Sequence, residues 1–281
     1  MKPSAEVRIG AVRGALPRPA MTALVAARSA LAWRSDAVHQ DALAQMRFVL
    51  EETRPDADIA AAARAYVRYQ ARRGEVRWHP ELITRLPVSG LEHLAGARDR
   101  GRGVVLSFMH HAFYEGAFAS IARLGIPTHM VVYPYMLRDD APGWLKQHIR
   151  VGTSNGGVAV SADIGNEGLV GLLGQGAVLA IASDVPGHTP MRFFGRDVVG
   201  SFGAARLATA TGSPVVVMTS EPGPDGPTVR LHEPLEPESF ASARELLDAI
   251  LPVHEAAQVA WPEAIDIPLS RWGTADIGAH Q

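Results

Sequence analysis

Hydrophobic and polar positions follow two different periods along this chain. From residue 20 to about residue 75, apolar residues recur at helical spacing, and residues 58–73 are rich in alanine. Gly74 supplies a helix stop after this stretch. No strand pattern occurs before about residue 82. The sequence therefore predicts an N-terminal helical segment over residues 1–80.

The pattern changes after residue 80, where short apolar runs rich in β-branched residues alternate with amphipathic segments. The runs predict strands at 103–109, 127–133, 157–161, 177–183, 214–219 and 228–232. The segments between and after them predict helices at 91–100, 115–124, 141–151, 166–173, 202–210 and 241–260. This alternation indicates an α/β domain over residues 81–281, separate from the helical segment or continuous with it. We expect a mixed, largely parallel sheet flanked by helices, with 228–232 as an edge strand.

The composition of the chain argues against several classes of protein and of functional site. The chain has 281 residues, with 27 Lys and Arg against 29 Asp and Glu, and 47% of its residues are hydrophobic. A net charge of −2 argues against nucleic-acid binding, and the apolar content argues against disorder. The absence of cysteine excludes disulfides, thiolate nucleophiles and cysteine-bound metals. All basic residues except Lys2 and Lys146 are Arg, which reflects base composition or a need to recognise phosphate.

The first apolar stretch, residues 21–33, is too short to span a bilayer. It contains Arg28, whereas a membrane span needs about 20 apolar residues. No secretory signal precedes it. We therefore expect a cytoplasmic protein. Its N-terminal helix either packs on its own domain or makes peripheral contact with the inner face of the membrane.

Several common catalytic motifs are absent. The chain has no Gly-x-Ser-x-Gly, no Gly-x-x-x-x-Gly-Lys-Ser/Thr, and no Gly-x-Gly-x-x-Gly after a predicted strand. These absences argue against an α/β-hydrolase, a P-loop NTPase and a dinucleotide-binding enzyme.

Candidate chemistry lies at 107–116, which reads SFMHHAFYEG. His110 and His111 end a predicted buried strand, and Glu115 opens the next helix. A histidine takes up a proton near neutral pH, and a carboxylate on its other ring nitrogen fixes the tautomer. Such a dyad suits direct activation of a hydroxyl. Alternatively, the histidines are solvent-facing and Glu115 only complements the helix dipole. Alternation along a strand places the two histidines on opposite faces.

A metal site is a further alternative, built on histidines. His110, His111, His129 and His188 are its candidate ligands. Zinc usually takes three or more protein ligands, and no spacing in the chain specifies such a set. We expect no metal.

A second block of interest covers residues 182–217. Its predicted loop holds Asp184, Arg192 and Arg196, and the helix that follows opens at Gly203. Free N–H groups at a helix start can receive an anion. Alternatively, the two phenylalanines of this block belong to the core and its glycine to a turn.

Taken together, the two blocks resemble the lysophospholipid acyltransferase superfamily. The branch they resemble holds the bacterial lipid A late acyltransferases and the phosphatidylinositol mannoside acyltransferases. The matching positions are His110 and Glu115 as His-x4-Glu, Asp184, the Phe-Phe-Gly-Arg turn at 193–196, Gly203, and Thr-Gly-Ser-Pro-Val-Val at 211–216. The likeness covers residues 85–235. The chain departs from the family in residues 112–114, at Val185 after the aspartate, and in lacking an apolar anchor.

The resemblance implies a glycerol-3-phosphate acyltransferase-like fold. It also implies transfer of a fatty acyl group from acyl-CoA or acyl carrier protein to a hydroxyl of a lipid, glycolipid or specialised metabolite, without a cofactor. His110 would be the general base and Glu115 would orient it. Substrate-binding residues would be Arg150, Asp184, Arg192, Arg196 and Gly203. Alternatives are a non-catalytic lipid-binding member, a metal-dependent hydrolase and a thioesterase-like hydrolase.

Overall fold

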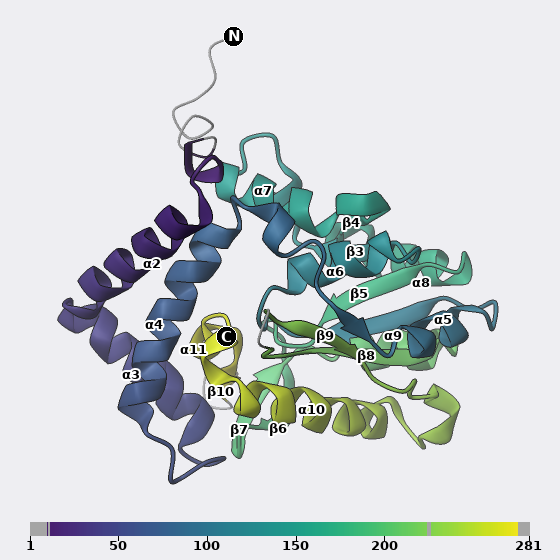
Figure 1. The fold of residues 1–281 in the computed structure, drawn as a ribbon. Coiled ribbons are helices and arrows are strands. Elements are labelled where there is room, and N and C mark those ends of the chain that lie inside the picture. Colours follow the sequence, from purple (N-terminus) through teal and green to yellow (C-terminus); the bar gives the residue numbers. More distant parts are fainter. Residues whose placement is uncertain (1–9, 11, 224–225, 275–281) are drawn as a thin grey trace.

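Three long helices make up most of the N-terminal segment of the computed structural model, which describes residues 10, 12–223 and 226–274 (Figure 1). They are α2 (Arg18–Trp33), α3 (Asp36–Leu50) and α4 (Ile59–Val76). Asp58 caps α4, because its side chain accepts a hydrogen bond from the backbone N–H of Ala61. The first strand of the described chain, β1, begins only at Val88. The predicted helical character of this segment is therefore confirmed.

A seven-stranded sheet forms the centre of the rest of the molecule. Its order is β1-β9-β8-β2-β5-β3-β4, and neighbours pair in parallel except β8 with β9. The strands are β1 (Val88–Ser89), β2 (Val104–Phe108), β3 (Thr128–Val132), β4 (Val158–Ser161), β5 (Val178–Ala182), β8 (Val215–Glu221) and β9 (Thr228–Leu231). The expected α/β class with a mixed, largely parallel sheet is confirmed.

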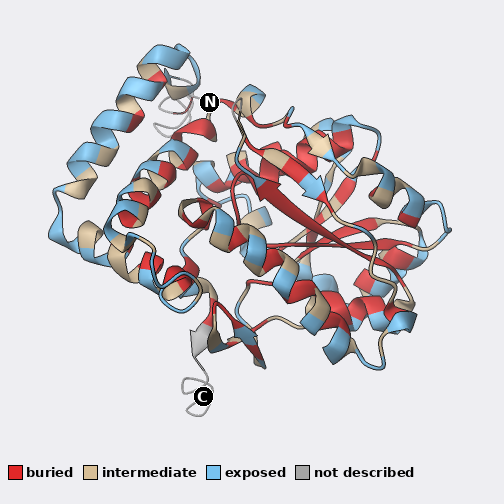
Figure 2. Ribbon diagram, turned by 60° about the horizontal axis from the view of Figure 1, so that its bottom comes forward, coloured by how far each residue is buried: buried red, intermediate tan, exposed pale blue. Residues whose placement is uncertain are grey.

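Helices cover both faces of this sheet, and its central strands β2, β5 and β8 are almost wholly buried (Figure 2). The helices are α5 (Leu91–Arg98), α6 (Tyr114–Arg123), α7 (Gly143–Gly152), α8 (Gly165–Gly174), α9 (Gly203–Thr211) and α10 (Ala243–Ala260), whereas α11 (Pro268–Arg271) packs against α3. Successive residues of β2 face opposite layers. Val105 packs in one hydrophobic cluster, and Val104 and Leu106 pack in the other.

The edge of the sheet differs from the prediction. Residues 228–232 were expected to form an edge strand, but β9 has neighbours on both sides. The two residues of β1 pair in parallel with Val229 and Arg230 on its outer side. A two-residue strand carries no periodicity, so the sequence pattern gave no sign of it.

A second, antiparallel sheet stands beside the main one. It consists of β6 (Thr189–Phe193), β7 (Arg196–Gly200) and β10 (Gly273–Thr274). Phe194 and Gly195 form the β6–β7 turn with φ of 53° and 68°, which is typical of a two-residue hairpin loop. The Phe-Phe-Gly-Arg sequence is therefore a hairpin turn whose phenylalanines enter the core.

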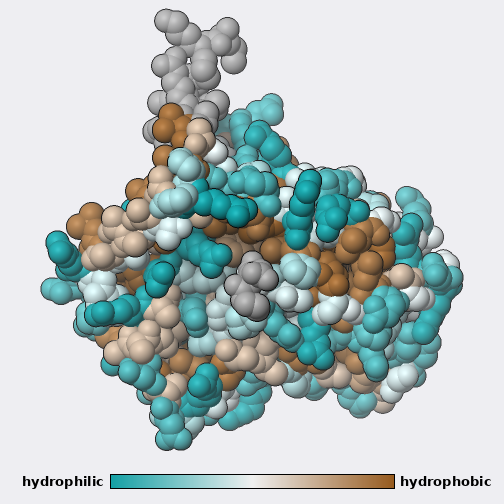
Figure 3. All heavy atoms as spheres, viewed as in Figure 1, coloured by the Kyte–Doolittle hydropathy of each residue, from teal (hydrophilic) through white to brown (hydrophobic). Residues whose placement is uncertain are grey.

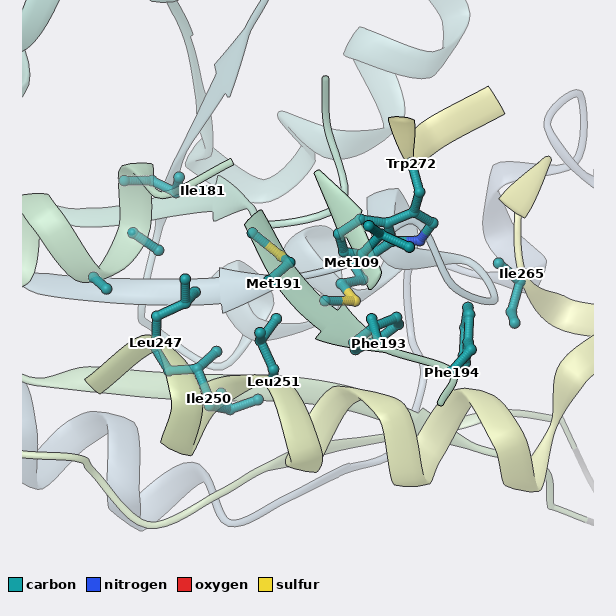
Figure 4. Close-up of a cluster of buried hydrophobic side chains, with 14 of the residues drawn as sticks. Met109, Ile181, Met191, Phe193, Phe194, Leu247, Ile250, Leu251, Ile265 and Trp272 are labelled. Carbon is teal, nitrogen blue, oxygen red and sulfur yellow. The ribbon is translucent and has the colours of Figure 1, made fainter. Parts of the chain in front are cut away.

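That core joins the N-terminal helices to the α/β layers (Figure 4). Phe193 and Phe194 pack with α10 residues such as Leu251 and with Trp272. Met46 and Leu50 of α3 belong to the same buried cluster. Among the described residues, no helix combines the length and hydropathy that a bilayer crossing requires.

Helix α6 approaches the preceding chain so closely that only glycine fits at position 116. A Cβ atom there would lie 2.4 Å from the carbonyl oxygen of Ile83. We predict that Gly116→Ala lowers the free energy of unfolding by about 2 kcal/mol, because backbone must move apart. Urea unfolding measures the change. The control Gly96→Ala, in α5 with no atom within 4 Å of the added Cβ, should stabilise by about 0.5–1 kcal/mol. Equal effects of the two substitutions would contradict the prediction.

Candidate active site

Two chain segments that leave neighbouring strands meet at the carboxyl edge of the sheet. The β2–β5 pairing sets Phe108 opposite Ala182, so residues two positions further along each chain also come together. These residues are His110 and Asp184. Asp184 Oδ1 lies 2.8 Å from His110 Nδ1, and Asp184 Oδ2 accepts a 2.8 Å hydrogen bond from the backbone N–H of His110. The aspartate therefore holds both the ring and the backbone of His110.

The protonation states of this pair follow from burial and charge. Burial lowers the pKa of His110, although Asp184 opposes the shift, so the imidazole is neutral at pH 7. Burial alone would raise the pKa of Asp184, but His110 and Arg271 lower it. An ionised carboxylate only accepts hydrogen bonds, so Nδ1 of His110 carries the proton. Nε2 then keeps a free lone pair.

The carboxylate that contacts His110 is thus Asp184, and the expected partner Glu115 lies elsewhere. Glu115 is buried in the first turn of α6, and its Oε1 lies 3.6 Å from Nδ1 of His148 in α7. The reason is local. Ala112 has φ of 55°, and this left-handed turn starts α6 with Glu115 directed toward α7 instead of the end of β2.

Glu115 is nevertheless a charged group inside the protein. Burial would raise its pKa, but His148 and Arg73 lower it to about 2. Its Oε2 has no hydrogen-bond partner among the described residues. The structure therefore contains a second histidine–carboxylate pair close to the first.

Tyr114 stands between the two pairs. Its hydroxyl lies 3.3 Å from Nε2 of His148, and its ring meets the ring of His110 edge to face, with centroids 4.7 Å apart. Burial raises the pKa of Tyr114, so the phenol stays protonated.

His110, Tyr114 and His148 line one cavity of about 190 Å³. Apolar side chains form most of its remaining wall: Phe108, Met130, Val131, Val132, Met136, Ala162, Ile181, Ala182 and Val185. A mostly apolar cavity with a few converging polar groups is typical of a small-molecule site. The Nε2 lone pair of His110 is available to a reactant at this site.

Distant segments brace the loop that carries His110. The backbone N–H of Asp266 donates to the carbonyl of His110 at 2.9 Å. The Asp266 carboxylate lies between Arg73 of α4, at 2.7 Å, and Arg271 of α11, at 2.6 Å. Arg271 also lies 3.6 Å from Asp184. No local motif signalled these residues, because their contacts join parts of the chain far apart in sequence.

His111 lies apart from the cavity, as strand alternation suggests. Its side chain is buried, and Nε2–H donates to the carbonyl of Trp261 at 3.0 Å. Burial lowers the pKa of His111 to about 4, so the ring is neutral. His254 of α10 is also buried: it shares a 3.0 Å hydrogen bond with Ser107 of β2, and burial lowers its pKa to about 3.

The predicted substrate-binding arginines lie outside the His110 cavity. Arg150 of α7 is exposed and donates to Gln147, and Arg192 pairs with Asp197 within the β6–β7 hairpin. Arg196 lies 2.6 Å from Glu51, at the end of α3.

Gly203 is nearer to the cavity, at the start of α9. Its backbone N–H donates to the hydroxyl of Ser201 at 3.2 Å, and Ser201 lines the cavity. The histidines at 129 and 188 lie on β3 and after β5. No group of three or more metal-ligating side chains gathers in the part of the chain that the structure describes.

Comparison with solved structures finds chains of similar fold. The chain is similar to the 1-acyl-sn-glycerophosphate (LPA) acyltransferase PlsC from Thermotoga maritima, with 14% sequence identity, a TM-score of 0.42, and coverage of 78% of this chain and 94% of that chain. No protein-family model matches the chain, and no curated protein does.

The buried histidines predict a stability that depends on pH. A histidine has a pKa near 6.5 when unfolded, whereas His254 and His111 remain neutral in the fold down to about 3 and about 4. Below pH 6.5 these histidines bind protons in the unfolded state but not in the folded state, so the free energy of unfolding falls as pH falls. Each histidine should remove about 2 kcal/mol between pH 7.5 and pH 5.

Chemical unfolding across this pH range tests the prediction. His254→Gln should have a shallower dependence than the unmodified protein. His188→Gln, which changes an exposed histidine, should keep the original slope. An unchanged slope in His254→Gln would contradict the account.

Proposed function

We propose that this chain is an acyltransferase that moves a fatty acyl group from an acyl thioester to a hydroxyl group. One observation carries the proposal. A neutral His110, oriented by the ionised Asp184, lines a mostly apolar cavity with Nε2 free. Such a group is a general base for a hydroxyl acceptor beside a binding site for an apolar chain. The motif order that resembles the lysophospholipid acyltransferase superfamily supports the same class.

The chemical step needs no covalent enzyme intermediate. Nε2 of His110 takes the proton of the acceptor hydroxyl while its oxygen attacks the thioester carbonyl carbon. The tetrahedral intermediate then expels the thiolate as the C–S bond breaks. The imidazolium returns its proton to that sulfur, and the products are an ester and a free thiol. Asp184 stabilises the transient charge on His110.

Glu115 has a positioning role in this proposal. Glu115 is ionised and only accepts, so it favours a proton on Nδ1 of His148. Nε2 of His148 then accepts a hydrogen bond from the Tyr114 hydroxyl, which holds the Tyr114 ring against the ring of His110. Glu115 thus acts through His148 and Tyr114, whereas Asp184 acts on the base.

We propose the acyl donor and the acceptor by chemical class. The apolar part of the cavity suits the acyl chain of acyl-CoA or of acyl carrier protein. The acceptor is a hydroxyl-bearing lipid, glycolipid or specialised metabolite.

Acyl transfer is tested by incubating the purified protein with acyl-CoA and a lipid extract. Mass spectrometry detects the acylated products, and a thiol assay measures the release of free thiol. His110→Ala should remove the acylated product. His111→Ala should lose about 1–3 kcal/mol of stability, since it leaves the Trp261 carbonyl unpaired, but should keep transfer at a temperature where it is folded. Thiol release without any acylated product would indicate a thioesterase instead.

Two matched substitutions distinguish the roles of Asp184 and Glu115. Asp184→Asn should lower kcat by about 10²- to 10⁴-fold, because the amide no longer fixes the Nδ1–H tautomer of His110. Glu115→Gln should have a smaller effect on kcat, because Glu115 does not contact His110. Steady-state kinetics with circular dichroism as a folding control measures both. A larger loss in Glu115→Gln would return Glu115 to the role that the linear motif suggested.

A further inference from the structure

A surface groove lies along the N-terminal helices, apart from the His110 cavity. It has a volume of about 980 Å³, and its walls come from α2, α4 and the short helix η6 (Pro262–Ala264) with the preceding Trp261. Figure 3 shows hydrophobic surface over α2 beside hydrophilic surface over α4. No residue of the groove also lines the His110 cavity. The groove is therefore a second concave site.

Arginines line one side of this groove. Arg64, Arg68 and Arg72 recur every four residues, so they share one face of α4 along about 12 Å of helix. Arg34, just after α2, faces the same groove. None of these arginines has a carboxylate within 4.0 Å among the described residues, whereas the neighbouring Arg73 is paired with Asp266.

This arrangement costs stability unless something binds to it. Like charges four residues apart on a helix repel, and exposed guanidinium groups hold oxyanions well. Arg64 lies over the ring of Trp33, 5.2 Å from its centroid, and Arg72 lies 5.8 Å from the ring centroid of Phe113. These ring contacts hold two of the cations in place without neutralising them.

The floor of the groove is apolar. Met21, Val25 and Tyr69 lie at its base, and Ala61 and Ala65 of α4 leave room above them. Polar groups beyond the arginines are few: the hydroxyls of Thr22, Ser29 and Tyr69, the indole N–H groups of Trp33 and Trp261, and the carboxylate of Glu263. A recessed apolar floor beside a cationic row fits a hydrocarbon chain joined to an anionic group.

We propose that the groove binds one molecule of an anionic lipid. Its anionic head group lies along the row of Arg64, Arg68 and Arg72, and an acyl chain lies on the apolar floor. A flat bilayer does not reach a recessed floor, and a nucleotide base needs more hydrogen-bonding partners than this floor offers. The proposal does not depend on acyl transfer at His110.

The test uses a short-chain lipid below its micelle concentration. Dihexanoylphosphatidylglycerol should bind the full chain and change tryptophan fluorescence, because Trp33 and Trp261 line the groove. Dihexanoylphosphatidylcholine, which is zwitterionic, should bind at least about tenfold more weakly, because it brings no net negative charge to the arginines. The triple variant Arg64→Gln, Arg68→Gln, Arg72→Gln should lose binding by at least about tenfold.

Control variants distinguish binding in the groove from a general effect of positive surface charge. The triple variant Arg47→Gln, Arg98→Gln, Arg123→Gln removes the same charge from exposed positions outside the groove and should bind as the unmodified chain does. Ala61→Trp fills the groove at an exposed position without changing charge and should weaken binding of the lipid.

Four results would overturn the proposal. The first is an equal loss of lipid affinity in the two triple variants, and the second is binding of inorganic phosphate as tight as that of the lipid. The third is binding to phosphatidylglycerol vesicles only, and the fourth is no binding of the monomeric short-chain lipid. Because binding is read without turnover, a failure of acyl transfer leaves this result unaffected, and the reverse also holds.

Discussion

The candidate site depends on the register of two buried parallel strands. Pairing of β2 with β5 sets Phe108 opposite Ala182, and His110 and Asp184 meet because each lies two residues beyond that pair. A slip of one residue would bring Ser183 to His110 and leave the imidazole without its carboxylate. Both strands lie in the middle of the sheet, with neighbours on each side and helices over both faces, so their register is strongly determined.

Buried charge is the second constraint. Ionised carboxylates inside a protein are costly unless each meets a partner. Asp184 meets His110 and Arg271, and Asp266 meets Arg73 and Arg271. These pairs join the strand ends to α4 and to the C-terminal segment. Removing one partner leaves another charge uncompensated, so segments without a reactive group of their own help to maintain the geometry of the site.

Sequence patterns predict most of the elements because buried strands and amphipathic helices have strong periods. They also place His110 at a strand end. The His-x4-Glu spacing suggests Glu115 as its partner, whereas the carboxylate in contact with His110 is Asp184. A spacing of five residues does not say how a helix is rotated after a left-handed residue such as Ala112. Asp184 is recognised from the second block, but its contact with His110 follows only from strand order, which the linear pattern does not contain.

The arginines of the second block illustrate the same limit. Arg192 and Arg196 belong to a hairpin, and their carboxylate partners are Asp197 in that hairpin and Glu51 at the end of α3. A guanidinium that fits phosphate fits a carboxylate equally well, so residue type alone does not identify its partner. Only the folded chain shows which arginines are already paired.

Two adjacent residues of α4 make this distinction most clearly. Arg73 points into the protein, where it pairs with Asp266 and lies over the ring of Tyr114. Arg72 is exposed, lines the α2–α4 groove and lies over the ring of Phe113. Consecutive side chains on a helix diverge by about 100°, so one helix serves both the buried charge network and the open cationic groove. Since Phe113 and Tyr114 belong to the segment that leads from His110 into α6, α4 contacts both the groove and the chain next to His110.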